Sequence, residues 1–283
     1  MRTVMPVLLL AAWLAPRPLE AWGFDVHRAL TARAIELLPA EIRPVFEANR
    51  IFVVEHSIDP DLWRSAGFEE EPPRHFLDMD AYGRYPFTQL PEQYDAAVRR
   101  FGEQRVVGNG TVPWRAAEIY ARLVDAFRAV GRSRTPYERD DVLFFSTVLG
   151  HYVSDAVVPF HAVLNYDGQL TNQRGIHARF ETALFARYGD RLTLAPARPE
   201  PMRDPVAAVF ATLREGTRLV PRLLQADRDA LGDGRDYDAA YFDRFFAGAR
   251  PILERRLREA IAAIASAVTG AWETAGSPPL ERR

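Results

Sequence analysis

Residues 140–157 read Asp-Asp-Val-Leu-Phe-Phe-Ser-Thr-Val-Leu-Gly-His-Tyr-Val-Ser-Asp-Ala-Val, and this stretch decides the fold class. The two aspartates suit the first turn of a helix, and the apolar residues after them recur at intervals of three and four. His151 and Asp155 lie four positions apart within this apolar run, so they project from the same face of a helix. The stretch therefore predicts a helix near the core that presents a polar pair.

The same apolar spacing continues along most of the chain, and strand-like alternation is scarce. We therefore predict an all-α fold, a compact multi-helix single domain, because a chain of 283 residues can bury a sizeable core. Clusters of glycine and proline interrupt the pattern, but they are too short to be interdomain linkers. Further helices are predicted over Val26–Leu38, Ala96–Phe101, Pro113–Val130, Ile176–Tyr188, Asp204–Leu223 and Asp238–Thr269.

Residues 1–21 are predicted to form a secretory signal peptide. Arg2 supplies a positive start, an apolar run covers Val4–Leu14, and Leu19-Glu20-Ala21 ends in a small residue suited to cleavage. The apolar run is well short of the roughly 20 residues that cross a bilayer. We therefore expect no transmembrane segment, and we expect residues 22–283 to form one domain that is secreted or periplasmic.

The composition narrows the classes of partner. The formal net charge is −2, so the chain has no basic footprint for duplex nucleic acid. It contains no cysteine, so an exported chain must draw its stability from the core, from bound metal or from both. Nothing in the sequence indicates a protein partner.

A second helical pair repeats the spacing of the first. His177 and Glu181 lie four residues apart, and His161 stands between the two pairs, after Val158-Pro-Phe. One such pair is usually a surface salt bridge, whereas two pairs in apolar surroundings need buried partners, which a metal cluster provides. Imidazole with carboxylate, and without thiolate, suits zinc or another borderline divalent metal better than calcium or magnesium.

Three more motifs complete a pattern: Trp22-Gly-Phe-Asp-Val-His27, Asp61-Leu-Trp-Arg64 and His75-Phe-Leu-Asp78. From Trp22 to Glu181 the chain resembles the bacterial zinc-dependent phospholipases C together with the single-strand-specific zinc nucleases. The resemblance implies a trinuclear zinc cluster in a cleft. The first ion would be held by Asp61, His75, His151 and Asp155, the second by His161, His177 and Glu181, and the third by His27, Asp155 and Trp22, the latter as a free N-terminus.

The resemblance also implies an activity, hydrolysis of a phosphodiester by an exported enzyme. A hydroxide held between zinc ions would attack phosphorus, since paired divalent ions lower the pKa of a shared water to about 7 or below. Asp61 and Asp155 would take part through the metal ions. Arg64 would neutralise the charge that develops on the phosphoryl oxygens.

Several alternatives stay open at this point. Asp59 competes with Asp61 for the first carboxylate, and we favour Asp61 for its spacing to Arg64 and His75. His56 matches no motif and is expected to be a plain surface histidine or to contact a ligand. The N-terminal motifs resemble the nucleases, and the C-terminal ones resemble the phospholipases, so the substrate is either single-stranded nucleic acid or phospholipid. A periplasmic zinc-binding structural protein without turnover is the alternative from another class.

Overall fold

The computed structural model describes residues 23–130, 132, 137–195 and 198–280. It confirms the all-α prediction, because the described residues form helices and connecting turns and include no strand. None of the described helices is long and apolar enough to cross a membrane. The predicted signal peptide and Trp22 lie outside the described residues.

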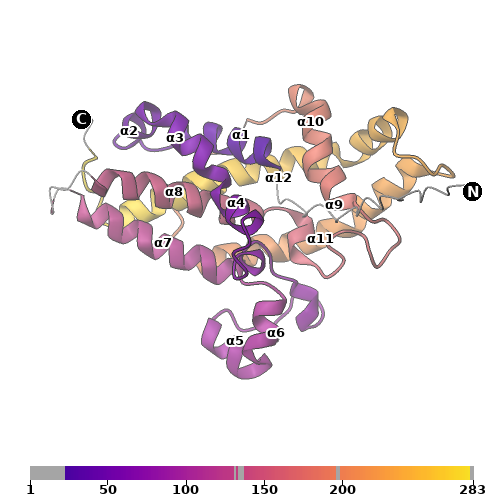
Figure 1. Cartoon of the computed structure of the whole chain (residues 1–283), viewed down its shortest axis with the longest axis horizontal. Coiled ribbons are helices and arrows are strands. Elements are labelled where there is room, and N and C mark those ends of the chain that lie inside the picture. The colour runs from indigo at the N-terminus through magenta and orange to yellow at the C-terminus, as the bar shows by residue number, and fades with distance from the viewer. Residues whose placement is uncertain (1–22, 131, 133–136, 196–197, 281–283) are drawn as a thin grey trace, which may run out of the picture.

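Four long helices form the frame of the molecule and run along its long axis (Figure 1). The central one, α8, packs against α7 and α12, and α11 packs against the same two helices. All four were predicted from apolar spacing. Their observed bounds are α7 Val112–Ala129, α8 Tyr137–Asp155, α11 Pro205–Leu231 and α12 Ala239–Thr274.

The helix α11 extends further than predicted. We expected it to end at Leu223, but it continues to Leu231 with Pro221 inside it. Buried residues continue beyond it at Leu224, Asp227 and Ala230, so tertiary packing maintains the helix despite the hydrogen bond that proline removes.

The helix α8 is buried over most of its length, because α1 (Phe24–Ile35), α7 and α12 surround it. Gly150 permits the close approach of α12. A Cβ at this position would lie 3.2 Å from Cγ2 of Ile264, tighter than ordinary van der Waals contact. The next residue, His151, is fully buried, and an unpartnered polar group is costly in such a place.

Several short helices escaped prediction because six or seven residues contain too little of a helical period. The helix α4 lies beside α8, and α5 and α6 project together from one edge of the bundle (Figure 1). The short elements are α2 (Arg43–Ala48), α3 (Arg50–Glu55), α4 (Asp59–Ser65), α5 (Tyr94–Phe101) and α6 (Glu103–Gly108), with the 3-10 turns η1 (His56–Ile58), η2 (Pro72–Arg74), η3 (Met79–Tyr82) and η4 (Pro159–Ala162). Of these, only α5 was anticipated.

The predicted helix over Ile176–Tyr188 needs correction. It consists of a first turn, α9 (Ile176–Ala178), then a π-turn, η5 (Arg179–Ala183), and then α10 (Leu184–Tyr188), before the 3-10 turn η6 (Gly189–Arg191). Arg179 inside the π-turn is buried and binds Asp227 of α11, a tertiary contact that apolar spacing does not reveal. Turns of this kind occur frequently at functional sites.

Candidate metal centre

Three groups of buried histidine and carboxylate side chains converge around the C-terminal end of α8. Within each group the potential ligand atoms lie within 4.8 Å of one another. The groups overlap the sets that the sequence resemblance implies, with three differences: Trp22 is outside the described residues, Asp155 is not in the group of Asp61 and His75, and His151 rather than Asp155 is shared by two groups. They are His27, His151 and Asp155; Asp61, His75 and His151; and His161, His177 and Glu181.

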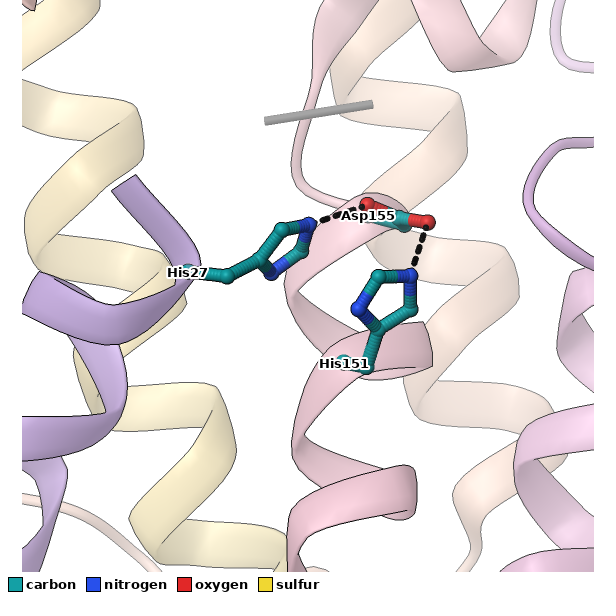
Figure 2. Close-up of side chains that lie close together, drawn as sticks. All are labelled: His27, His151 and Asp155. Atoms are coloured by element: carbon teal, nitrogen blue, oxygen red, sulfur yellow. Dashed lines mark ion pairs between the residues drawn. The ribbon is translucent and has the colours of Figure 1, made fainter. Parts of the chain in front are cut away.

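The first group joins α1 to α8. Figure 2 shows His27 and His151 approaching the two oxygens of Asp155. Nε2 of His27 lies 3.3 Å from Oδ1, and Nε2 of His151 lies 3.3 Å from Oδ2. The two imidazole rings stack with their centroids 4.1 Å apart. The predicted helical pair therefore shares its carboxylate with a histidine more than 120 residues away in sequence.

The second group adds side chains from α4 and from the segment after η2. Nδ1 of His75 lies 2.8 Å from Asp155 Oδ2, 3.2 Å from His151 Nε2 and 3.8 Å from Asp61 Oδ1. Arg64 is one helical turn from Asp61, and its Nη2 lies 3.0 Å from Asp61 Oδ1. One carboxylate, Asp155, thus contacts histidines of both groups.

The third group lies between η4 and the π-turn. Nε2 of His177 is 3.0 Å from Glu181 Oε2, and the rings of His161 and His177 meet edge to face with centroids 4.9 Å apart. His161 is oriented by a hydrogen bond between its Nδ1 and the carbonyl oxygen of His75, at 2.8 Å. The second and third groups are therefore coupled through the backbone of His75.

The segment that carries His75 is fixed by backbone contacts. Leu77 donates its N–H to the carbonyl oxygen of His161, and Asp78 donates to that of Asn109. Gly110 permits this packing, because its φ is +95° and a Cβ there would lie 2.1 Å from the Phe76 carbonyl oxygen. The His-Phe-Leu-Asp motif is thereby placed beside α8 without belonging to a regular element.

Burial and ion pairing shift the titration of these groups in different directions. Burial would raise the pKa of Asp155, but His151, His27 and His75 hold it well below its usual range. Burial lowers the pKa of His75, whereas Asp155 and Glu71 more than offset this and raise it to about 9. Burial lowers the pKa of His161 to about 3 and that of His177 to about 4. The third group therefore presents neutral imidazoles at pH 7, the form that binds a metal ion.

Several polar atoms of these groups are buried without hydrogen bonds to the part of the chain that the structure describes. Oδ2 of Asp61 and Nδ1 of His177 are among them, whereas Oδ1 of Asp61 and Nε2 of His177 are engaged only by the ion pairs described above. Buried polar atoms without hydrogen bonds are costly, and coordination of a cation would satisfy them. The donor set of imidazole and carboxylate suits zinc. The residues present therefore fit a metal ion in the second and third groups.

A cavity of about 380 Å³ opens onto the centre. Burial and, to a smaller extent, Asp80 raise the pKa of Asp78 in its wall to about 7. Tyr166, from the loop after η4, contributes to the wall. The other lining residues are Arg64, Pro72, His75, Phe76, Gly108, Phe160, His161 and His177.

The structure distinguishes Asp59 from Asp61, the two candidates for the first carboxylate of the predicted site. Asp61 is fully buried and belongs to the second group, whereas Asp59 pairs with His56, Oδ2 to Nδ1 at 2.8 Å. The side chain of His56 is 42% exposed and joins none of the three groups, as expected for a surface histidine. Whether Asp61 binds a metal ion stays a prediction.

Sequence reasoning missed two residues beside the centre, Glu71 and Tyr152. Glu71 is the third residue of the run Glu69-Glu70-Glu71, which precedes two prolines and therefore suggests an exposed loop. Its carboxylate is nevertheless buried beside His75 and accepts a hydrogen bond from the hydroxyl of Tyr152. The spacing of four residues between Glu71 and His75 was the available signal.

Comparison with known proteins found no match to a family model and no match among curated proteins.

Proposed function

We propose that the protein is an exported zinc-dependent phosphodiester hydrolase. The observation that carries this proposal is the convergence of three buried histidine and carboxylate groups beside one cavity, whose wall includes His75, His161 and His177. The proposed ligands are Asp61, His75, His151 and Asp155 for one ion, His161, His177 and Glu181 for the second, and His27 and Asp155 with the N-terminal Trp22 for the third.

Zinc ions at these positions would supply a hydroxide nucleophile at neutral pH and polarise a phosphoryl oxygen. The protein's own part is to fix the ligands and to exclude water around them. Asp155 contacts three histidines, so its carboxylate orients ligands from α1, from α8 and from the segment after η2. These residues come from rigid helices or from a segment tied down by backbone hydrogen bonds, which suits a preorganised site.

Arg64 has the position required of a phosphate-binding group. Its guanidinium lines the cavity and pairs with Asp61 through Nη2. Nε of Arg64 forms no hydrogen bond with the described residues, whereas Nη2 is engaged by the ion pair with Asp61. A guanidinium with donors to spare beside a metal centre can bind phosphoryl oxygens as negative charge develops on them.

The cavity wall suits a phosphodiester with an apolar or aromatic substituent. Phe76, Phe160 and Tyr166 line it together with the single guanidinium of Arg64. Single-stranded nucleic acid would stack its bases on the rings of Phe76 and Tyr166, and phospholipid would use the same rings for apolar contact. Both substrate classes contain the same reacting group, so the proposed reaction is independent of the choice between them.

The proposal is tested by metal analysis combined with hydrolysis assays. Zinc-loaded protein that begins at Trp22 is expected to bind about three ions and to hydrolyse bis-p-nitrophenyl phosphate, and Asp155→Asn is expected to abolish hydrolysis. His56→Asn, at an exposed histidine outside the groups, is the matched control and should keep full activity. Single-stranded DNA and phosphatidylcholine assayed side by side identify the substrate class. One ion or fewer per chain contradicts the three-zinc arrangement.

A structural zinc site is the second candidate, because the ligands join α1, α4, α8 and the π-turn in a chain without cysteine. Full zinc occupancy without hydrolysis of any phosphoester would favour it.

The role of Trp22 has its own test. A free α-amino group binds zinc once deprotonated, whereas an amide nitrogen does so poorly. Protein with one additional Met before Trp22 should bind fewer zinc ions and be much less active. Equal activity of the two forms would remove Trp22 from the site.

A further inference from the structure

In two histidines of the centre, His27 and His151, a group outside the three ligand sets holds Nδ1. Nδ1 of His151 lies 2.9 Å from the carbonyl oxygen of Ser57, and Nδ1 of His27 lies 3.2 Å from Oγ of Ser154. In both residues Nε2 then faces Asp155. A contact of this kind fixes the tautomer of a metal-binding imidazole and orients its ring.

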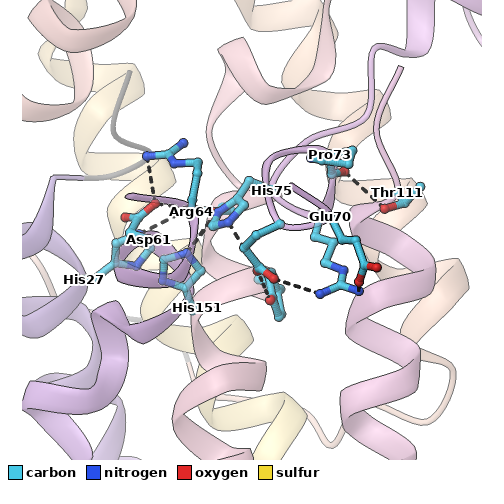
Figure 3. A network of polar contacts seen from close by, with 12 residues as sticks. His27, Asp61, Arg64, Glu70, Pro73, His75, Thr111 and His151 are labelled. Carbon is cyan, nitrogen blue, oxygen red and sulfur yellow. Dashed lines mark hydrogen bonds and ion pairs between the residues drawn. The ribbon is translucent and has the colours of Figure 1, made fainter. Parts of the chain in front are cut away.

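The ring of His75 has the opposite orientation to those of His27 and His151. Its Nδ1 faces Asp155, Asp61 and His151, and its Nε2 points away from them, 3.5 Å from Oε1 of Glu71. Figure 3 shows His75 between Asp61 and His151 on one side and the polar network that reaches Glu70 on the other. The outward nitrogen of His75 therefore faces a carboxylate, whereas that of His151 faces a backbone carbonyl.

Glu71 is itself held in place. Its side chain is buried, the hydroxyl of Tyr152 donates to Oε1, and Nη1 of Arg74 donates to Oε2 at 2.9 Å. Tyr152 follows His151 on α8 and is fully buried. The guanidinium of Arg115 on α7 lies 5.3 Å from the centroid of the Tyr152 ring. The carboxylate thus has little freedom to leave His75.

We propose that Glu71 is a positioning residue that keeps the proton of His75 on Nε2, so that Nδ1 is the atom offered to the metal ion. This inference rests on the proposed function only in requiring that zinc binds with His75 as a ligand. Glu71 is too far outside the ligand groups to bind the same ion through Oε1, because the imidazole ring of His75 stands between them. Its negative charge increases the basicity of Nδ1 across the ring.

The test compares two substitutions that leave the ligands intact. Glu71→Gln keeps the size of the side chain and removes the charge that faces Nε2. Tyr152→Phe is the matched control, because it removes another partner of the same Oε1 without touching the proton of His75. We expect Glu71→Gln to weaken the zinc ion held by Asp61, His75 and His151 about 10- to 100-fold. Tyr152→Phe should weaken it much less, with zinc affinity measured by competition against a chromophoric chelator.

The tautomer of His75 is read directly by ¹⁵N nuclear magnetic resonance of histidine-labelled, zinc-loaded protein. In the wild type we expect His75 to bind metal through Nδ1 and to carry its proton on Nε2. This measurement needs no variant, so it decides the inference even if Glu71→Gln fails to fold. Metal binding through Nε2 of His75, or zinc affinity and tautomer unchanged in Glu71→Gln, overturns the role of Glu71 alone. Failure of the wild type to bind zinc overturns the proposed function as well.

Discussion

Replacement of Asp227 by alanine should destabilise the protein strongly, although this residue belongs to none of the ligand groups. The carboxylate is buried between α11, α12 and the π-turn. Its Oδ1 accepts hydrogen bonds from Arg179, at 2.9 Å from Nη2 and 3.3 Å from Nε, and from the hydroxyl of Tyr241. Its Oδ2 accepts from Nε2 of Gln173 at 2.7 Å. The substitution therefore leaves one buried cation and two buried neutral donors without their acceptor.

The expected loss can be worked from these contacts. Removal of one partner of a buried ion pair costs about 3–5 kcal/mol. Arg179 keeps hydrogen bonds to the carbonyl oxygens of Arg174 and Gln173, and Gln173 keeps one to the carbonyl oxygen of Leu224, which moderates the penalty. We therefore expect a decrease of about 3 kcal/mol in the free energy of unfolding, out of the roughly 5–15 kcal/mol typical of a folded domain.

Urea unfolding of EDTA-treated protein measures this loss without a contribution from metal. Glu118→Ala is the control, because the Glu118 side chain is 45% exposed and its pairs with Arg115 and Arg122 should contribute less than about 1 kcal/mol. In zinc-loaded protein, Asp227→Ala should also weaken the ion held by His177 and Glu181, since Arg179 lies in the π-turn between them. A loss no larger than that of the control would refute the view that the Arg179–Asp227 pair maintains this turn.

Three further predictions concern metal, pH and the guanidinium at the cavity. Zinc at 100 times its dissociation constant should stabilise the protein by about 2.7 kcal/mol for each site. Calorimetry with and without EDTA should therefore show a rise in Tm of about 5–10 °C for each occupied site. The stability of EDTA-treated protein should peak near pH 6.5. In the folded protein the pKa of His161 is lowered to about 3 and that of His177 to about 4. As the pH decreases below 6.5, these histidines therefore take up protons in the unfolded chain before they do so in the folded protein. The free energy of unfolding decreases over this range until the pH reaches the folded-state pKa values. The pKa of His75 is raised to about 9, so its contribution to the free energy of unfolding is complete below pH 6.5 and is lost as the pH rises toward 9. Thermal melts from pH 4 to pH 9 should therefore show Tm decreasing on both sides of pH 6.5. Arg64→Ala should lower kcat/KM for bis-p-nitrophenyl phosphate by about 10²–10³-fold with unchanged zinc content, and unchanged turnover would exclude Arg64 from phosphate binding.

The long helices could be predicted because each repeats its apolar period several times against a continuous core. The short elements could not, because α2, α3 and α4 are only six or seven residues long and depend on packing beside α1 and α8. The π-turn at Arg179–Ala183 escaped for a different reason, since its buried arginine binds a carboxylate 48 residues further along the chain. No local pattern contains that contact.

The candidate site, like the fold, could be predicted from the sequence only in part. Spacing alone placed His151 beside Asp155 and His177 beside Glu181, and both pairs lie in contact, at 3.3 Å and 3.0 Å. Spacing did not indicate that His27 would reach Asp155 from α1, and that expectation came from the resemblance to zinc enzymes. Glu71 was missed because a run of three glutamates before two prolines suggests solvent, whereas the contact with Tyr152 places its last member in the core.

The position of the cavity favours catalysis over a purely structural role for the metal centre. Structural zinc sites are closed by protein ligands, whereas catalytic sites keep a position open to substrate. Here the cavity wall includes three of the proposed ligands, His75, His161 and His177, whereas His27 and Asp155 do not line it. The ion held by His161, His177 and Glu181 would therefore be reached from outside, and the ion near His27 would be shielded by the helices around it. A substrate that enters beside Arg64 would meet the ligands in the cavity wall first, so substitutions at His161 and His177 should impair turnover more than they impair stability, and His27 should show the opposite balance.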